Sequence, residues 1–258
     1  MSVLLDPDTI LEQQNTETVL NEEVLNMAIS GDLENLEAST AEEVLRRVLA
    51  SKASSVVCLT CSFQAEDIIV LNLLRKRIPK IPVLFLETGY HFAETYQFRD
   101  QITREWDLNL VNVVPRKTVA QQESEFGILY RDEPTKCCQL RKVEPLMEAL
   151  EPFEVWFTGL RREQSPTRKN LRKAEDHRLP SGKTVLKVSP LADWTWAKVW
   201  EYTGANRLNY LPQYDEGYAS IGCEPCTALP GDPNNPRSGR WGGKKLECGI
   251  HTFSERTQ

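Results

Sequence analysis

The 258 residues are 40% hydrophobic and 26% charged, the composition of a globular protein long enough for one large α/β domain or two small ones. No apolar stretch approaches the roughly 20 residues of a membrane-spanning helix, and the first residues lack the basic and apolar regions of a secretory signal. The net charge of −6 argues against nucleic-acid binding, so we expect a cytoplasmic protein with neither a membrane nor a nucleic acid as its partner.

Residues 1–50 form an acidic N-terminal segment. They contain eleven acidic and two basic residues, so residues 51–258 carry a net charge of +3. Apolar residues recur at helical spacing, and Ser39 or Thr40 precedes AEEVL as a helix start with acidic residues in its first turn. We predict two or three amphipathic helices over residues 8–50, which serve in packing or in a subunit contact and leave a homo-oligomer open.

Residues 51–235 alternate between short apolar runs and helical patterns. The apolar runs predict strands at 54–60, 81–88, 108–115, 154–160 and 184–191. Helical patterns at 66–77 and 92–106 separate the first three of them. Strands that alternate with helices of this length favour an α/β fold, with a mostly parallel sheet covered by helices on both faces.

The second half of the chain adds a basic segment and an irregular tail. Nine basic residues stand against three acidic ones between Arg161 and Lys187, and either Arg161 or Arg162 could hold a phosphate after a strand end. A helix is predicted over 193–208, and its aromatic residues are interpreted as core: Trp194, Trp196, Trp200 and Tyr202. Gly and Pro then multiply, so residues 236–258 are expected to be an irregular, mobile tail within one structural domain.

The segment Thr60–Asp67 is predicted to join the first strand to the first helix at the carboxyl edge of the sheet, where open α/β sheets bind ligands. Free backbone N–H groups, the helix start and the hydroxyl of Ser62 would favour an anion there. The segment matches neither a Walker motif nor GxGxxG, and a plain strand–helix connection is the alternative. Cys58 and Cys61, in or beside the apolar run, are interpreted as ordinary buried residues.

Seven cysteines in a cytosolic chain indicate metal binding or catalysis rather than a disulfide framework. Cys137 and Cys138 are adjacent, and Cys223 and Cys226 form a CxxC motif, so the two pairs can surround one metal centre. A [4Fe–4S] cluster spreads its ligands over four irons and accommodates adjacent cysteines better than one tetrahedral zinc does. Zinc and unligated thiols remain the alternatives.

Cys248 lies in the segment KKLECGIH near the C-terminus. Neighbouring cations favour its nucleophilic thiolate, whereas Glu247 opposes ionisation, and an inert surface cysteine is the alternative. Arg237 and Arg240 are spaced R-x-x-R, and their planar guanidinium groups suit phosphate or sulfate oxygens. Lys142 is expected to project from the same helical turn region as the adjacent cysteines, toward an anionic substrate.

The motifs SFQAED, CC with CxxC, GLRREQSPTR and ECGIH together resemble the assimilatory adenylyl-sulfate (APS) reductases, relatives of the phosphoadenylyl-sulfate (PAPS) reductases. The resemblance covers about residues 50–252. It implies an adenine-nucleotide α-hydrolase-like fold related to the ATP pyrophosphatases, with SFQAED in place of their SGGxDS loop. The resemblance also implies reduction of APS to sulfite and AMP, in sulfate assimilation for cysteine synthesis.

Carried over residue by residue, the resemblance gives one [4Fe–4S] cluster to Cys137, Cys138, Cys223 and Cys226. It makes Cys248 the nucleophile that attacks the sulfur of APS, with an S-sulfocysteine intermediate that thioredoxin or a similar dithiol protein resolves. The implied substrate-binding residues are Ser62, Phe63, Glu66, Leu86, Glu87, Thr88, Gly89, Lys142, Gly159, Arg162, Arg237, Arg240 and His251. The family more often has Asp where Glu87 stands.

Three alternative functions remain at this stage. The same reaction could use PAPS, although Glu66 and Asp67 would repel its additional 3′-phosphate. A cluster-containing ATP pyrophosphatase that modifies tRNA would account for the basic segment, but it should carry SGGxDS. A metal-bearing binding module or redox sensor would leave ECGIH unexplained.

Overall fold

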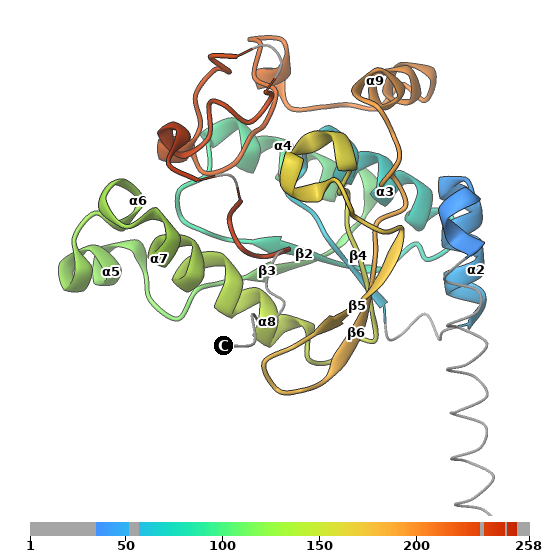
Figure 1. Cartoon of the computed structure of the whole chain (residues 1–258), viewed down its shortest axis with the longest axis horizontal. Helices are drawn as coiled ribbons and strands as arrows, with labels where there is room; N and C mark the ends of the chain where they lie inside the picture. Colours follow the sequence, from blue (N-terminus) through green and yellow to red (C-terminus); the bar gives the residue numbers. More distant parts are fainter. Residues whose placement is uncertain (1–34, 52–56, 233–234, 246, 252–258) are drawn as a thin grey trace, which may run out of the picture. The chain divides into compact units, whose positions relative to one another are not determined.

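The computed structural model describes residues 35–51, 57–232, 235–245 and 247–251 (Figure 1). The chain divides into two compact units, Met1–Ser39 and Thr40–Gln258. Of the first unit only residues 35–39 are described, with the 3-10 turn η1 (Leu36–Ala38). Most of the predicted N-terminal helices therefore lie outside the described residues.

The second unit begins with α2 (Ala41–Ser51), and its start confirms the predicted cap. The backbone N–H of Glu43 donates to Thr40 Oγ1 over 3.3 Å, and the N–H of Thr40 donates back to the Glu43 carboxylate over 2.8 Å. This reciprocal pair satisfies two amide groups that the helix itself cannot use.

A six-stranded sheet forms the centre of the second unit, in the order β3-β2-β1-β4-β6-β5. The strands are β1 (Val57–Thr60), β2 (Pro82–Leu86), β3 (Asn109–Val113), β4 (Val155–Phe157), β5 (Ala174–Arg178) and β6 (Thr184–Val188). Neighbours pair in parallel except for the antiparallel hairpin β5–β6. The predicted α/β class with a mostly parallel sheet is confirmed. Strand β5 was missed, because its sequence AEDHR contains no apolar run.

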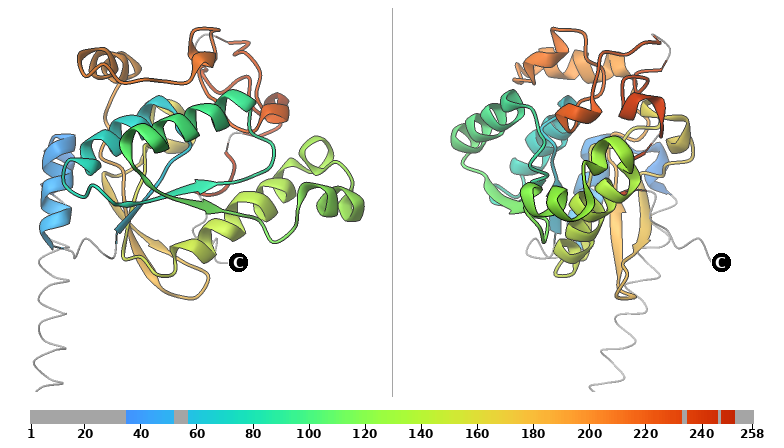
Figure 2. Two further views of the ribbon diagram at one scale, coloured as in Figure 1. Left: turned by 180° about the vertical axis from the view of Figure 1, so that it is seen from behind. Right: turned by 90° about the vertical axis from the view of Figure 1, so that its left-hand side faces the viewer.

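Helices cover the sheet on two faces (Figures 1 and 2). They include α3 (Ala65–Arg75) and α4 (Ala93–Trp106), and α9 (Trp196–Ala205) contacts α3. The region between β3 and β4 holds α5 (Val119–Phe126), α6 (Leu129–Asp132), α7 (Pro134–Cys138), the π-helical turn η3 (Gln139–Val143) and α8 (Glu144–Leu150). The ring of Phe63 contacts both Phe85 of β2 and Phe98 of α4. Its centroid lies 5.8 Å from that of Phe85 and 6.4 Å from that of Phe98. Since successive strand residues face opposite ways, Leu84 belongs to the other face.

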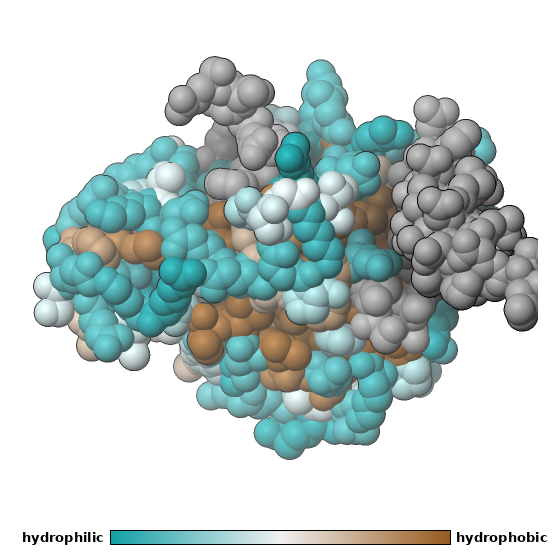
Figure 3. All heavy atoms as spheres, turned by 90° about the horizontal axis from the view of Figure 1, so that it is seen from below, coloured by the Kyte–Doolittle hydropathy of each residue, from teal (hydrophilic) through white to brown (hydrophobic). Residues whose placement is uncertain are grey.

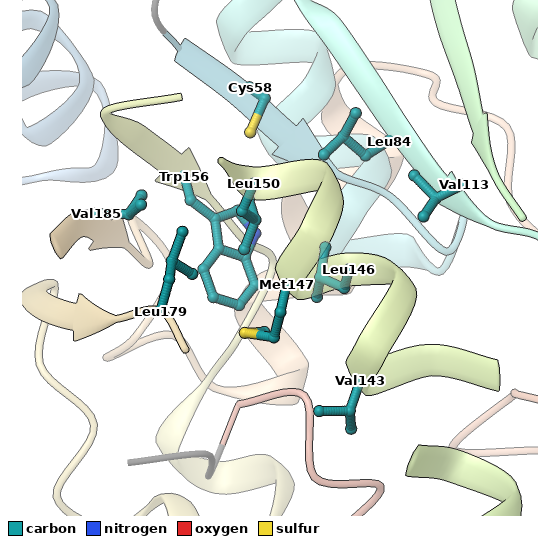
Figure 4. Close-up of a cluster of buried hydrophobic side chains, with 10 residues drawn as sticks. All are labelled: Cys58, Leu84, Val113, Val143, Leu146, Met147, Leu150, Trp156, Leu179 and Val185. Carbon is teal, nitrogen blue, oxygen red and sulfur yellow. The ribbon is translucent and has the colours of Figure 1, made fainter. Parts of the chain in front are cut away.

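On that other face, α8 packs against the strands (Figure 4). Leu146, Met147 and Leu150 of α8 are buried against Cys58 and Trp156, which project from β1 and β4. Burial raises the pKa of the Cys58 thiol far above its ordinary value, so this cysteine is an inert part of the core. Cys61 is also buried, and the interpretation of both as ordinary buried residues is confirmed.

The surface is largely hydrophilic in the view from below, and hydrophobic residues gather near its middle (Figure 3). In the part of the chain that the structure describes, three large hydrophobic side chains are classed as exposed, namely Val111, Val114 and Leu229. None of the described helices is both long enough and apolar enough to cross a bilayer.

Candidate active site

A cavity of about 440 Å³ opens at the carboxyl edge of the parallel strands. Its walls come from the loops that follow β1, β2 and β4, and from three later segments around residues 219–222, 236–241 and 248–251. The last of these segments, red in Figure 1, runs between the loops beyond α9 and the helices α7 and α8. Residues far apart in sequence therefore meet at the edge where a ligand of an open α/β sheet is expected.

The connection between β1 and α3 does not present free donors in the way that the sequence predicts. The backbone N–H of Ser62 donates to Asp67 Oδ2 over 2.7 Å, and the Ser62 hydroxyl donates to the same oxygen over 2.6 Å. Burial raises the pKa of Asp67 to about 6, although these hydrogen bonds and one from the N–H of Gly159 lower it. An internal carboxylate thus occupies both donors of Ser62 that an anion could have used.

Glu66 is compensated by Arg161 in the wall of the cavity. Nε and Nη2 of Arg161 donate to Glu66 Oε1 over 3.0 and 2.8 Å, and both side chains are almost fully buried. Arg161 therefore anchors α3 to the loop after β4. Arg162, by contrast, does not line the cavity; its Nε donates to the carbonyl of Leu171.

The predicted substrate-binding residues separate into two groups. Those that line the cavity are Ser62, Glu66, Leu86, Lys142, Gly159, Arg237, Arg240 and His251. Those outside its lining are Phe63, Glu87, Thr88, Gly89 and Arg162. Phe63 is buried in the core at a positive φ of 61°. Glu87 accepts a hydrogen bond from the hydroxyl of Tyr96 over 2.5 Å.

The two cysteine pairs come together beside the cavity. Cys137 and Cys138 end α7, while Cys223 and Cys226 flank the 3-10 turn η7 (Glu224–Cys226), and all four are buried. Burial raises the pKa of Cys137 to about 11, and the nearby charges of the other three thiols add to the effect. In the described residues, no group of three or more His, Cys, Asp and Glu side chains is arranged to hold a metal ion.

Lys142 connects the four cysteines to the cavity. It lies in η3, directly after α7, as predicted from its spacing. Burial alone would lower the pKa of Lys142, but the thiolates of Cys223, Cys138 and Cys248 raise it above its ordinary value. Lys142 in turn lowers the pKa of Cys223, against the effect of burial. A cation thus lies between the cysteine group and the space for a substrate.

Cys248 is half-buried and packs against the group formed by Cys138, Cys223, Cys226 and Trp241. It lines the cavity together with His251. The tail is tied down beyond the cysteine, because the His251 ring stacks on Trp156 with centroids 5.5 Å apart. The predicted irregular character of the tail is confirmed for its described part, where η8 (Trp241–Gly243) is a single 3-10 turn.

His251 is neutral near pH 7. Burial, reinforced by the charges of Lys187 and Arg168, holds its pKa well below the ordinary range. The buried Nδ1 atom has no hydrogen-bond partner among the described residues.

The buried Arg240 and the partly buried Arg237 complete the wall. Arg240 donates from Nε to the carbonyl of Cys226 and from Nη1 to the hydroxyl of Ser220, each over 3.2 Å. Burial and the positive charge of Arg168 lower the pKa of Arg237 to about 10. The cavity wall thus holds Arg168, Arg237 and Arg240, and such a set of cations favours an anionic ligand.

Arg168 is a charged cavity residue that the sequence analysis did not select. It ends the short turn η5 (Pro166–Arg168) and pairs with Glu247 over 2.8 Å. Its signal was present, because it is the last residue of the motif GLRREQSPTR. Two consecutive 3-10 turns, η4 (Arg162–Gln164) and η5, separate the two arginines, and it is Arg168 and not Arg162 that lines the cavity.

Four of the nine cations in the basic segment are buried, whereas Lys169, Arg172 and Arg178 are exposed. Four of its cations form ion pairs with buried or half-buried geometry: Arg161 with Glu66, Arg168 with Glu247, Lys173 with Asp193, and Lys187 with Glu175. These charges stabilise loops around the cavity and do not form a basic surface. Of the aromatic residues predicted as core, Trp194 is buried, whereas Trp196 lines the cavity.

Comparison with known proteins gives consistent matches. The phosphoadenosine phosphosulfate reductase domain matches residues 56–229. An adenosine 5′-phosphosulfate reductase of Geobacillus kaustophilus is 44% identical over 199 residues, 76% of this chain and 83% of the relative. Adenosine 5′-phosphosulfate reductase 1 of Bacillus subtilis is 43% identical over 74% of this chain and 82% of the relative. The tail with Cys248 lies beyond the domain match.

Solved structures with lower identity share the fold. A phosphoadenylyl-sulfate (PAPS) reductase from Candida auris superimposes with a TM-score of 0.64 at 22% identity, covering 88% of this chain and all of that one. An FMN adenylyltransferase of Candida glabrata, in complex with FMN and an ATP analogue, reaches 0.57 at 14% identity over 78% of this chain and 67% of that one. These likenesses support the predicted adenine-nucleotide α-hydrolase-like fold.

Proposed function

Because the chain belongs to the adenosine 5′-phosphosulfate reductases of the phosphoadenosine phosphosulfate reductase domain family, we propose that it reduces adenosine 5′-phosphosulfate (APS) to sulfite and AMP, with Cys248 as the nucleophile. The reaction belongs to sulfate assimilation for cysteine synthesis. One observation carries the assignment of the nucleophile: the tail brings Cys248 to the wall of a cavity large enough for a nucleotide, at the carboxyl edge of the sheet.

The first step is a displacement at sulfur. The Cys248 thiolate attacks the sulfur of APS, a new S–S bond forms, and the bond from sulfur to the bridging phosphate oxygen breaks. AMP leaves with the electron pair, and S-sulfocysteine remains on the protein. A thiolate and a doubly anionic substrate repel each other, so the cavity must supply positive charge. The cations that line it are Lys142, Arg161, Arg168, Arg237 and Arg240.

The second step needs an external dithiol protein, for which thioredoxin is our candidate. One thiolate attacks the Cys248 sulfur, and sulfite leaves with the electron pair of the S–S bond. The second thiolate then resolves the mixed disulfide and restores Cys248, so the dithiol supplies both electrons. Because Cys248 is half-buried, the tail must open for this attack. Thiol chemistry of this kind needs a reducing compartment, and we place the reaction in the cytoplasm.

The residues present fit a [4Fe–4S] cluster held by Cys137, Cys138, Cys223 and Cys226. The donor set consists of four buried thiols from two pairs, each near the others' charges, and thiolates are the usual ligands of such clusters. When bound, the cluster would supply a compact charged centre beside Lys142. The lysine itself remains the group that faces both the cysteines and the cavity.

APS is the proposed substrate rather than PAPS. The carboxylate of Glu66 is neutralised by Arg161, so repulsion of a 3′-phosphate depends on Asp67 and not on both acids as expected. A comparison of kcat/KM for the two nucleotides tests the choice. A clear preference for PAPS would contradict it.

The ATP-dependent tRNA-modifying alternative loses support from two observations. Asp67 occupies the N–H and the hydroxyl of Ser62, which a pyrophosphate would otherwise use. Four of the nine cations in the basic segment that favoured RNA are buried in ion pairs. The contact of Asp67 with Ser62 suits a loop that positions a nucleotide without binding a pyrophosphate at Ser62.

Mass spectrometry tests the nucleophile directly. Enzyme mixed with APS in the absence of reductant is expected to gain one SO₃ group on Cys248 and to release one AMP per chain. Cys248→Ser should form no adduct and no sulfite while keeping the iron content of the wild type. Sulfite formation by that variant at the wild-type rate would refute the assignment.

A further inference from the structure

Glu247, the residue before the proposed nucleophile, is held by side chains that surround the cavity. Arg168 donates from Nε to Glu247 Oε1 over 3.0 Å and from Nη2 to Oε2 over 2.8 Å. The hydroxyl of Thr167 donates to Oε1 over 2.8 Å, and Nη2 of Arg237 lies 3.6 Å from Oε2. The side chains of Arg168 and Glu247 are each 9% exposed. A bidentate pair of this kind restricts both distance and direction.

Arg168 is connected at its other side to the β1–α3 connection. Its Nη1 donates to Gln164 Oε1, and Gln164 Nε2 donates to Glu66 Oε1 over 3.0 Å. Glu66 stands in the first turn of α3, next to the Asp67 that binds Ser62. A continuous series of hydrogen bonds therefore links the proposed nucleotide loop to the residue before Cys248.

Glu247 is unsuited to contact the substrate itself. Its carboxylate would repel a phosphosulfate, and its positive neighbours hold its pKa below the ordinary value despite burial. The carboxylate instead accepts hydrogen bonds from Arg168 and Thr167. Its chemistry is that of an anchor for the tail.

We propose that Glu247 is a positioning residue, whose ion pair with Arg168 holds Cys248 in line with the nucleotide cavity for attack on APS. The inference rests on the proposed function of Cys248. The stack of His251 on Trp156 holds the tail beyond Cys248, and the ion pair holds it before Cys248, so breaking the pair frees one side of the cysteine for the dithiol. Misplacement of a reacting atom by about 1 Å can lower a rate by about 100-fold.

The test is Glu247→Gln, which keeps the shape of the side chain and removes its charge. In single-turnover reactions without reductant, AMP release is expected to slow by about 10- to 100-fold, with the KM for APS changed less than about 3-fold. Alkylation of Cys248 by iodoacetamide in the absence of APS should become several-fold faster, because the tail opens more often. Glu216→Gln, at an exposed position outside the cavity, is the matched control and should behave like the wild type.

A second variant separates the ion pair from a general loss of structure. Glu247→Asp retains the charge, and its single-turnover rate should lie between those of Glu247→Gln and the wild type. A rate no higher than that of the Gln variant would overturn the role of the ion pair. A wild-type rate in Glu247→Gln would overturn it as well, and so would a several-fold lower KM, since Glu247 would then compete with the substrate for Arg168.

The adduct keeps this test distinct from that of the proposed function. If the wild type gains no SO₃ on Cys248, the proposed function itself fails. If the wild type forms the adduct and Glu247→Gln forms it equally fast, only the positioning role fails. Iron content and thermal unfolding of the variants, measured beside the wild type, show that the comparison is between folded proteins.

Discussion

Asp67 is a partly buried acidic residue in the wall of the cavity. Burial raises its pKa from an ordinary 3.8 to about 6, and the neighbouring charge of Glu66 adds to the effect. Because the folded state binds this proton more tightly than the unfolded chain does, Asp67 favours folding at low pH. That contribution is lost as the pH rises from about 4 through 6. The difference corresponds to about 3 kcal/mol.

Replacing Asp67 by Asn removes this titration and keeps an oxygen that can accept from Ser62. At pH 7.5 the variant is expected to unfold at a higher urea concentration than the wild type, by up to about 3 kcal/mol in the free energy of unfolding. The difference in free energy of unfolding between the variant and the wild type should shrink as the pH falls from 7 to 4.5. Asp215→Asn, on the exposed surface, serves as the control. A gap that stays constant with pH would show that the ionisation of Asp67 is not its cause.

At this scale, residue identity and spacing predicted much of the site but not its orientations. The four cysteines and Cys248 could be selected because few other functions explain their arrangement, and the structure brings them together. Arg162 was named as a substrate-binding residue and Arg168 was not considered, because the two consecutive 3-10 turns that place Arg168 at the cavity leave no local sequence pattern. The contact of Asp67 with Ser62 was also hidden, since a pattern typical of anion binding does not show that a carboxylate already occupies the donors.

At the scale of elements, the end of β4 and the start of α3 approach so closely that Gly159 is required between them. A Cβ atom at Gly159 would lie 2.4 Å from Asp67 Oδ1 and 2.9 Å from the backbone nitrogen of Asp67. Backbone atoms cannot move aside as a flexible side chain can. The two elements that form the floor of the cavity therefore depend on the absence of a side chain at this position.

Gly159→Ala is expected to separate β4 from α3, lower the stability by about 1–3 kcal/mol and raise the KM for APS several-fold. Gly204→Ala in α9 is the matched control, since a Cβ there meets no atom within 4 Å. That control should be neutral or stabilising by up to about 1 kcal/mol, because Ala favours helices over Gly. Steady-state kinetics and thermal unfolding check both variants. Wild-type values in Gly159→Ala would mean that the close approach has no functional weight.

The elements that the sequence analysis missed are those whose signals are local or polar. The segment between β3 and β4 contains four short helices and a π-helical turn, none with the long apolar stripe that identifies α3. One start signal was readable, because Thr118 and Gln121 form a capping box. Strand β5 is recognisable only through its pairing with β6. Pairing is a tertiary interaction, and no local pattern shows it.

At the scale of the whole molecule, the fold sorts seven cysteines into three environments. Cys58 lies within the core and Cys61 is a buried residue of the cavity wall, and burial raises the pKa of each far above its ordinary value. Four others form the group beside α7 and η7, and Cys248 alone is half-buried at the cavity. Thiol reactivity follows exposure and thiolate content. The three environments should therefore differ in their rates of alkylation.

Counting the modified thiols under different conditions tests this division. Protein prepared without oxygen and treated briefly with iodoacetamide should carry one label per chain, on Cys248, as mass spectrometry of its peptides can show. Removal of iron by a chelator frees the proposed cluster ligands, so the number should rise from one toward five. Cys58 and Cys61 should react only after denaturation, because the chelator leaves the core intact. Five labels before iron removal, or no increase in labels after it, would contradict the assignment of four thiols to iron. Labelling of Cys58 before denaturation would contradict the packing of α8 on the sheet.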